Sequence, residues 1–147
     1  EGGVFFGFER NQWSARAEVR QGLDGGHEGL VGRVALSRSG QVELFGQTGF
    51  YSIGPEVVLG DETYLQEYFG ITAAQSAGSD LEISTPYAGI VSAGVKGKVY
   101  IPLGRTWGVG AFANINFLGD NAGDSSLVVE RGSDTQVMGG ITVVYNF

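Results

Sequence analysis

Alternation of apolar and polar residues with a period of two constrains this chain more than any other feature. It is clear where Trp107 and Val109 alternate with Gly108 and Gly110. Successive side chains of a β-strand point to opposite faces, so this period predicts strands with one apolar face and one polar face. The same pattern predicts seven strands, at residues 4–10, 13–21, 30–37, 42–59, 87–103, 107–118 and 136–147.

The glycine content points to the same fold class. Glycine makes up 26 of the 147 residues, which is about 18%, against roughly 7% in an average protein. Glycine inside a helix costs about 1 kcal/mol relative to alanine, and the glycines have no three-residue period of the collagen kind. Because 42% of the residues are hydrophobic, the chain is too apolar to be disordered. We therefore expect one all-β domain over residues 1–147.

The length of the strands favours a membrane protein. Several exceed the roughly 5–6 residues of ordinary strands, and about 9–11 residues suffice to cross a bilayer at a tilt. Charged residues stand singly on the polar face, and aromatic residues flank the apolar one. This predicts an antiparallel transmembrane β-barrel of the outer-membrane type. A soluble β-sandwich or a lipocalin-like barrel is the alternative, since its strands also alternate but with the apolar face inward.

Two sets of strand residues have predicted places in such a barrel. Aromatic residues at the membrane interfaces would form a girdle of Trp13, Trp107 and Phe117. Charged residues on the polar face would point into the lumen, namely Arg16, Glu18, Arg20, Arg33, Glu43, Lys96 and Lys98. Because both signs of charge occur, we expect ion pairs that plug a narrow interior, with a selective pore lining as the alternative.

The connections between strands alternate between short and long, as the periplasmic turns and external loops of outer-membrane barrels do. Tight turns are predicted at residues 9–12, 38–40 and 103–106, and long external loops at about 23–29, 61–86 and 119–134. In the second long loop, Thr72 and Gln75 have the spacing of a helix-capping box, which predicts a helical turn at residues 72–77.

The number of predicted strands is odd, whereas single-chain bacterial barrels have an even number. The chain also shows no initiator methionine and no signal-peptide pattern. We therefore expect an N-terminally truncated part of a larger barrel, with about seven to eight strands present. A missed strand within residues 61–72 would instead give eight.

The residue inventory argues against catalytic, cofactor and metal sites. The chain has no cysteine and a single histidine, His27, which excludes thiol chemistry and leaves few ligands for a transition metal. We expect His27 to be a solvated loop residue, with a metal ligand or general base as the alternative. One loop holds a set of carboxylates without the spacing of a calcium loop, namely Asp120, Asp124, Glu130 and Asp134. The net charge of −7 argues against nucleic acid as a partner.

The C-terminal strand carries apolar or aromatic residues at alternate positions, Val143, Tyr145 and Phe147. This pattern resembles the signal read by the outer-membrane barrel-assembly machinery, which would therefore be a partner. Such an edge strand is suited to pairing with another sheet edge. One departure is Thr142, where that signal usually has glycine.

Three stretches of sequence resemble the MipA/OmpV family of outer-membrane proteins: residues 20–30, residues 64–77, and residues 118–120 followed by 129–136. Family members begin with a signal peptide and further strands, so the chain resembles their C-terminal portion. The resemblance implies a non-enzymatic barrel in the Gram-negative outer membrane, in contact with its lipid. The family name refers to interaction with the lytic transglycosylase MltA. For some members this implies a scaffold for murein transglycosylases and synthases. The alternatives are a small-solute channel or a surface adhesin.

Overall fold

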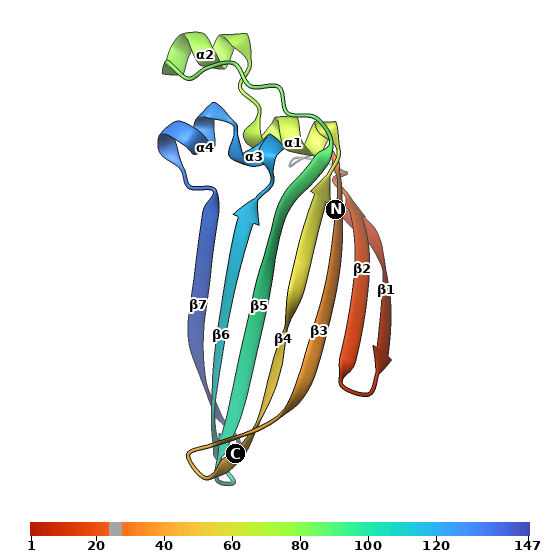
Figure 1. The fold of residues 1–147 in the computed structure, drawn as a ribbon, viewed down its shortest axis with the longest axis vertical. Coiled ribbons are helices and arrows are strands. Elements are labelled where there is room, and N and C mark those ends of the chain that lie inside the picture. The colour runs from red at the N-terminus through yellow and green to blue at the C-terminus, as the bar shows by residue number, and fades with distance from the viewer. Residues whose placement is uncertain (24–27) are drawn as a thin grey trace.

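A computed structural model describes residues 1–23 and 28–147 and shows one antiparallel sheet of seven strands in that part of the chain (Figure 1). The strands lie side by side in chain order. They are β1 (Gly2–Arg10), β2 (Trp13–Gln21), β3 (Leu30–Leu44), β4 (Gln47–Gly60), β5 (Gly89–Leu103), β6 (Trp107–Leu118) and β7 (Thr135–Tyr145). The predicted all-β, antiparallel fold class is confirmed. The alternative of an eighth strand within residues 61–72 is wrong, because most of that stretch forms helix α1 (Glu62–Phe69).

The sheet is a meander in which each strand pairs with the next as a hairpin. Pairing of β1 with β2, for example, runs without interruption from Gly2–Gln21 to Arg10–Trp13. The sheet curves along its whole width, as Figure 1 shows. It is open, because β1 and β7 are its two edges and are not paired with each other in the described residues.

The turn between β3 and β4 lies elsewhere than the sequence suggests. Residues 38–40 stay within β3, and the chain reverses at Phe45 and Gly46, whose φ angles are 54° and 71°. Two successive positive φ angles are what a type I′ hairpin turn requires. The prediction of a turn at residues 38–40 is wrong because the alternation of side chains continues unbroken through Gly40 as far as Leu44.

In the described residues, four helices lie in the long connections. They gather at one end of the sheet, which we call the helical end (Figure 1). Helices α1 and α2 (Ala73–Ser79) join β4 to β5, and α3 (Asp120–Gly123) and α4 (Ser126–Arg131) join β6 to β7. Thr72 caps α2 in the predicted capping box with Gln75, which confirms that helix. None of the helices in the described residues has the length and hydropathy needed to cross a membrane.

A small apolar cluster fastens the helices to the sheet. Leu65 of α1 and Ala122 of α3 are fully buried and pack with Val91 of β5. The strand register shifts between Val58 and Leu59, which leaves Val91 as the extra residue of a β-bulge. A bulge re-aims side chains, and it accounts for the burial of Val91 beneath α1, although simple alternation groups it with Ala93 and Val95.

Hydrogen bonds join the two long connections to each other. The buried hydroxyl of Ser125 donates to the carbonyl oxygen of Phe69 at 2.6 Å, and Arg131 donates to the carbonyl oxygen of Ser79 at 2.9 Å. Because these bonds link segments more than fifty residues apart, the helices form one cap rather than two independent loops.

Candidate functional site

Strand register separates the residues of the sheet into two faces. We call the polar face the one that carries Glu18 of β2, Arg33 of β3 and Lys96 of β5, because cross-strand pairs point to the same side. All the charges that the sequence predicts to face a lumen lie on this one face, namely Arg16, Glu18, Arg20, Arg33, Glu43, Lys96 and Lys98. The opposite, apolar face carries Val95 and Ile115.

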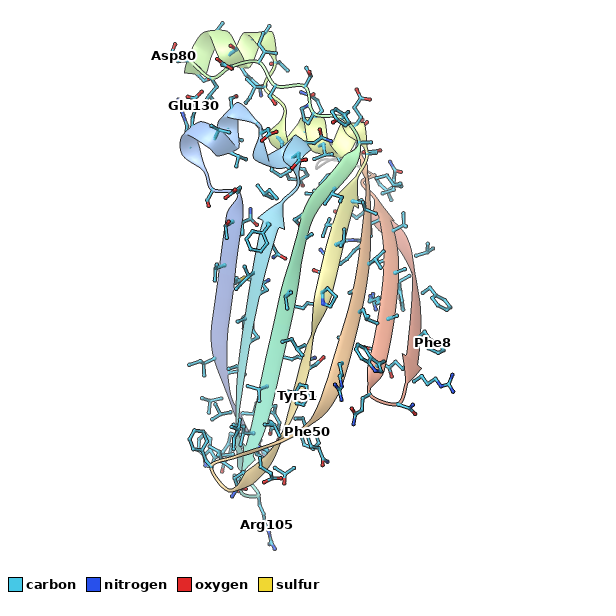
Figure 2. The ribbon with its side chains drawn as sticks, viewed as in Figure 1. Phe8, Phe50, Tyr51, Asp80, Arg105 and Glu130 are labelled. Carbon is cyan, nitrogen blue, oxygen red and sulfur yellow. The ribbon has the colours of Figure 1, made fainter. Side chains whose placement is uncertain are left out.

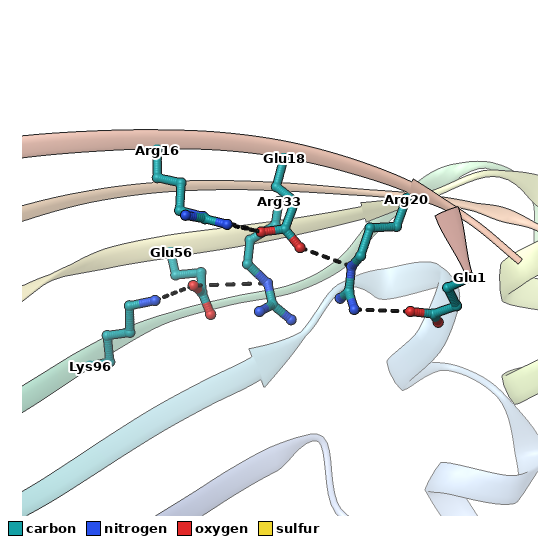
Figure 3. Close-up of polar contacts among 7 residues, drawn as sticks. All are labelled: Glu1, Arg16, Glu18, Arg20, Arg33, Glu56 and Lys96. Atoms are coloured by element: carbon teal, nitrogen blue, oxygen red, sulfur yellow. Dashed lines mark hydrogen bonds and ion pairs between the residues drawn. The ribbon is translucent and has the colours of Figure 1, made fainter. Parts of the chain in front are cut away.

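Two carboxylates form ion pairs with most of these cations on the concave side of the sheet (Figure 3). Glu18 lies between two arginines of its own strand, 2.9 Å from Arg16 and 2.9 Å from Arg20. Arg20 also reaches Glu1 at 3.1 Å. The side chain of Glu18 is only 18% exposed, so the two arginines replace much of the water that would otherwise solvate this carboxylate.

The second carboxylate, Glu56, is absent from the residues that the sequence singles out. It pairs with Lys96 and lies 3.9 Å from Arg33, and its side chain is 16% exposed. The sequence does contain a signal for it: Ser52, Gly54 and Glu56 are alternate residues of one strand and therefore share its polar face. Pro55 and the consecutive Val57 and Val58 obscure the alternation there.

Two glycines allow neighbouring strands to approach closely beneath this ion pair. A Cβ atom on Gly54 would collide with the carbonyl oxygen of Leu36 and lie 2.6 Å from the Cα of Ser37. A Cβ on Gly94 would collide with Asn116 and with the carbonyl oxygen of Ile115. Only glycine therefore allows the strands to approach this closely at both positions.

Lys98 and Glu43 stand apart from the ion pairs. Glu43 lies near the β3–β4 turn and accepts a hydrogen bond from Thr48 at 2.6 Å. Lys98 has no ion pair within residues 1–23 and 28–147. It lines a hollow of about 360 Å³ together with Lys96, Ser37, Ser52, Phe112 and Asn114. The structure thus collects basic and hydroxyl-bearing side chains in the middle of the polar face.

The predicted girdle residues lie on the apolar face near both ends of the sheet. Trp13 and Trp107 begin the strands that follow short turns, and each is about half exposed. Phe117 lies at the other end of β6, near the helices, and is 56% exposed. The three aromatic residues therefore form two groups, separated by the length of a strand.

The predicted assembly signal lies at the β7 edge. Val143 and Tyr145 are on the apolar face, where the ring of Tyr145 lies 4.6 Å from that of Trp107. Phe147 follows the end of β7 and packs edge-on against Tyr145 at 5.1 Å. It is otherwise fully exposed, so this aromatic pair presents a free surface beside an unpaired strand edge.

The loop residues that the structure describes are not arranged as a metal site. Asp120, Asp124 and Asp134 line one hollow of about 440 Å³ beside α3 and α4, but the part of the chain that the structure describes has no carboxylate or histidine group arranged to hold a metal ion. His27 lies outside the described residues.

Tyr64 of α1 packs against the apolar cluster formed by Leu65, Val91 and Ala122, and this burial raises the pKa of its hydroxyl group.

Comparison with curated proteins and with solved structures found no match. A scan against protein families found one that matches residues 1–147, the whole chain, and that is described as MltA-interacting protein MipA. The resemblance noted in three stretches of the sequence therefore extends from the first strand to the last. The chain belongs to the MipA family.

Proposed function

We propose that this protein is a non-enzymatic β-barrel of the Gram-negative outer membrane and a scaffold for murein-synthesising and murein-hydrolysing enzymes. The observation that carries the membrane assignment is the apolar face. Val4, Val137 and Ile141 on it are each at least 71% exposed. Among the described strand residues, this face carries two charged side chains, Arg10 and Arg38. Both are register partners of Trp13 on the neighbouring strands, beside the β1–β2 turn. Lipid is the environment that covers such a face.

The scaffold assignment rests on the family description, which names an interaction with MltA. Short turns of outer-membrane barrels face the periplasm, so the end opposite the helices would face murein and its enzymes. That turn end carries Phe45, which is 91% exposed, at the tip of the β3–β4 turn. It also carries Arg105, which projects from the β5–β6 turn (Figure 2). Exposed aromatic residues and arginines are the usual anchors of protein interfaces.

The helical end of the molecule is strongly acidic, unlike the turn end. The connections at residues 61–88 and 119–134 contain nine carboxylates and one arginine, and Asp80 and Glu130 lie far from Arg105 (Figure 2). The carboxylates are Asp61, Glu62, Glu67, Asp80, Glu82, Asp120, Asp124, Glu130 and Asp134. An acidic enzyme would be repelled from the helical end and would dock at the turn end.

Fractionation of cells tests the membrane assignment. We expect the protein in the outer-membrane fraction, resistant to alkaline carbonate and released by detergent. A protein that is soluble and monomeric without detergent would overturn the assignment.

Co-purification with a murein transglycosylase tests the scaffold. We expect the Phe45→Asn and Arg105→Gln variants to retain at least tenfold less enzyme than the unchanged protein. Asn tolerates positive φ, so the first variant keeps the turn. Asp80→Asn, at the helical end, is the matched control and should bind normally. If both turn variants retain as much transglycosylase as the unchanged protein, the scaffold proposal is wrong.

A small-solute channel is the second candidate, and the hollow beside Lys98 favours it. The ion pairs of Glu18 and Glu56 favour a plugged interior instead. Conductance across planar bilayers separates them: stable, sizeable openings would establish the channel, and their absence would remove it.

A further inference from the structure

The two tryptophans lie on the apolar face at different positions along their strands. From Trp13, the cross-strand register runs through Arg38, Ile53 and Gly97 to Ala113 on β6. Trp107 lies six residues from Ala113 on the same strand, toward the turn end. Six residues span about 20 Å along a strand, and the four strand spacings between β2 and β6 span about 19 Å. The line from Trp13 to Trp107 therefore makes an angle of about 45° with the register rows.

This angle matches the inclination of the strands in outer-membrane barrels, which is roughly 35–45°. Register rows in such a barrel are inclined to the membrane plane by the same angle, so the two indole rings would lie at one depth. The hairpins agree with this arrangement, because the β1–β2 turn lies nearer to the helical end than the β3–β4 turn does (Figure 1). The apolar face also extends farther toward the turn end on the later strands, as far as Leu44, Leu103 and Val143.

The aromatic residue at the other end of β6 gives an independent check. Phe117 lies ten residues from Trp107 on the same strand and the same face. Ten residues span about 34 Å, which at an inclination of 45° corresponds to a height of about 24 Å. The apolar band of an outer-membrane barrel is about 25 Å tall. Phe117 and Trp107 are therefore placed to mark the two boundaries of one apolar band.

Both charged side chains of the apolar face in the described strands lie beside the Trp13 end of this line. Arg10 and Arg38 flank Trp13 on the neighbouring strands and are exposed. The guanidinium group of Arg38 lies 5.9 Å from the centre of the Trp13 ring. Neither arginine has an ion pair within residues 1–23 and 28–147, and Glu9 points to the other face, opposite Ser14. A charge on the lipid face is least destabilising near the membrane interface, where a charged headgroup can reach it.

We propose that the leaflet at the turn end meets the apolar face along the line from Trp13 to Trp107, and that Arg10 and Arg38 bind the phosphate group of an anionic phospholipid there. The two arginines are two strand spacings apart, about 10 Å, and their side chains are long enough to converge on one phosphate above the Trp13 ring. Arginine binds phosphate through paired, charge-assisted hydrogen bonds, and indole rings favour the boundary between hydrocarbon and water. The inference rests on the membrane assignment above and specifies which lipid groups contact which residues.

Depth-dependent quenching of fluorescence tests the oblique boundary, because the chain has two tryptophans. Trp13→Phe and Trp107→Phe each leave one indole ring in the full chain, which is refolded into phosphatidylcholine vesicles. Lipids brominated at successive positions of the acyl chain quench a ring most strongly at its own depth. We expect both variants to report the same depth, close to the headgroups. A boundary parallel to the register rows would instead separate the two rings by about 20 Å.

The two possible failures of this experiment differ in meaning. Clearly different depths for the two rings would overturn the oblique boundary and leave the membrane assignment standing. If none of the brominated lipids quenches either ring, the membrane assignment itself is wrong, and this inference fails with it. Heat-modifiable mobility in gels verifies that each variant is folded.

The same method identifies the lipid beside Trp13, with the Trp107→Phe protein as the parent. Brominated phosphatidylglycerol and brominated phosphatidylcholine, each diluted in unlabelled phosphatidylcholine, measure the relative affinity of the two lipids for this position. We expect a preference of about threefold or more for phosphatidylglycerol, which decreases with added salt. Replacing both arginines, Arg10→Gln together with Arg38→Gln, should abolish the preference.

Lys98→Gln is the control for the two arginine replacements, because it removes a positive charge from the polar face instead. This variant should keep the preference for phosphatidylglycerol. Equal binding of the two lipids by the parent protein, or a preference that persists without the arginines, would refute their assignment as a phospholipid site.

Discussion

Glu56 and Lys96 lie diagonally across β4 and β5, and each has a glycine as its direct cross-strand partner. Glu56 is opposite Gly94, and Lys96 is opposite Gly54. The absence of side chains at these two positions leaves the space in which the carboxylate and the ammonium group meet. Arg33 approaches the same carboxylate from β3, so one glutamate links three strands.

Replacing Glu56 with Gln tests the importance of this link. The variant keeps the shape of the side chain but leaves Lys96 and Arg33 without their carboxylate. Because the side chain of Glu56 is 16% exposed, we expect the free energy of unfolding to fall by about 1–3 kcal/mol. Urea unfolding of the protein in detergent micelles measures it.

Glu43→Gln is the control for that experiment. Glu43 is exposed, and within the described residues its side chain accepts a single hydrogen bond, from Thr48. Its replacement should therefore change stability by no more than about 0.5 kcal/mol. Equal unfolding midpoints for the Glu56 variant and the unchanged protein would contradict the prediction.

Gly54→Ala should disrupt the sheet where β3 and β4 approach each other closely. The added methyl group meets the backbone of Leu36 and Ser37, which cannot move aside as a flexible side chain can. We expect a loss of about 1–3 kcal/mol or more, or failure to fold, measured as loss of heat-modifiable mobility in gels. Gly7 lies on the same face, and a Cβ atom added there would have no neighbouring atom within 4 Å. Gly7→Ala should therefore leave stability unchanged or slightly raise it, and similar behaviour of the two variants would refute this account.

Leu65→Ala should loosen the helical cap and leave the sheet intact. Leu65 is fully buried between α1 and the sheet, and removing a buried leucine side chain costs about 2–5 kcal/mol. We expect protease cleavage within residues 61–88 to become at least tenfold faster, measured by limited proteolysis. Ile83→Ala in the same connection, where the side chain is 60% exposed, should cleave at the normal rate. Cleavage of the strands at the same rate as the cap would show that the two do not open separately.

Phe147→Ala should slow assembly without affecting stability. Phe147 contacts Tyr145 but is otherwise fully exposed, so the folded chain loses little when it is removed. We expect several-fold slower appearance of folded protein in the outer membrane, measured by pulse-chase, with an unchanged unfolding midpoint. Phe6→Ala at the opposite edge strand, also largely exposed, should assemble normally. Normal assembly of the Phe147 variant would show that this residue is not part of an assembly signal.

Periodicity predicts most of the strand residues and the faces of their side chains, apart from Val91 at the β-bulge, because side chains of a strand alternate between its two faces. It was insufficient for the β3–β4 turn. Ser39 and Gly40 have the composition of a turn, whereas the actual turn contains Phe45 at positive φ, a conformation that phenylalanine rarely adopts. Gly40 remains in the strand, where a Cβ would lie 2.9 Å from the ring of Tyr51.

The helices and the ion pairs show a second limit. Helix α2 was predictable from its capping box, but α3 spans only four residues and has no side-chain cap, so local sequence carries almost no signal for it. Alternation in the sequence is enough to place Glu56 on the polar face. It cannot predict that Glu56 pairs with Lys96 and Arg33, because those contacts depend on the register of three strands, and alternation alone does not determine register.

The excursion around α2 is closed at its base by two backbone hydrogen bonds between Ile71 and Ser84, at 2.8 and 3.1 Å. None of the α2 residues is buried, and Gly78 has open space around it. The chain therefore leaves and re-enters the cap through a fixed neck. A peptide tag inserted after Gly78 would project from the helical end without pulling on either strand. This position is a natural attachment point for a reporter epitope that reveals which end of the molecule is displayed on intact cells.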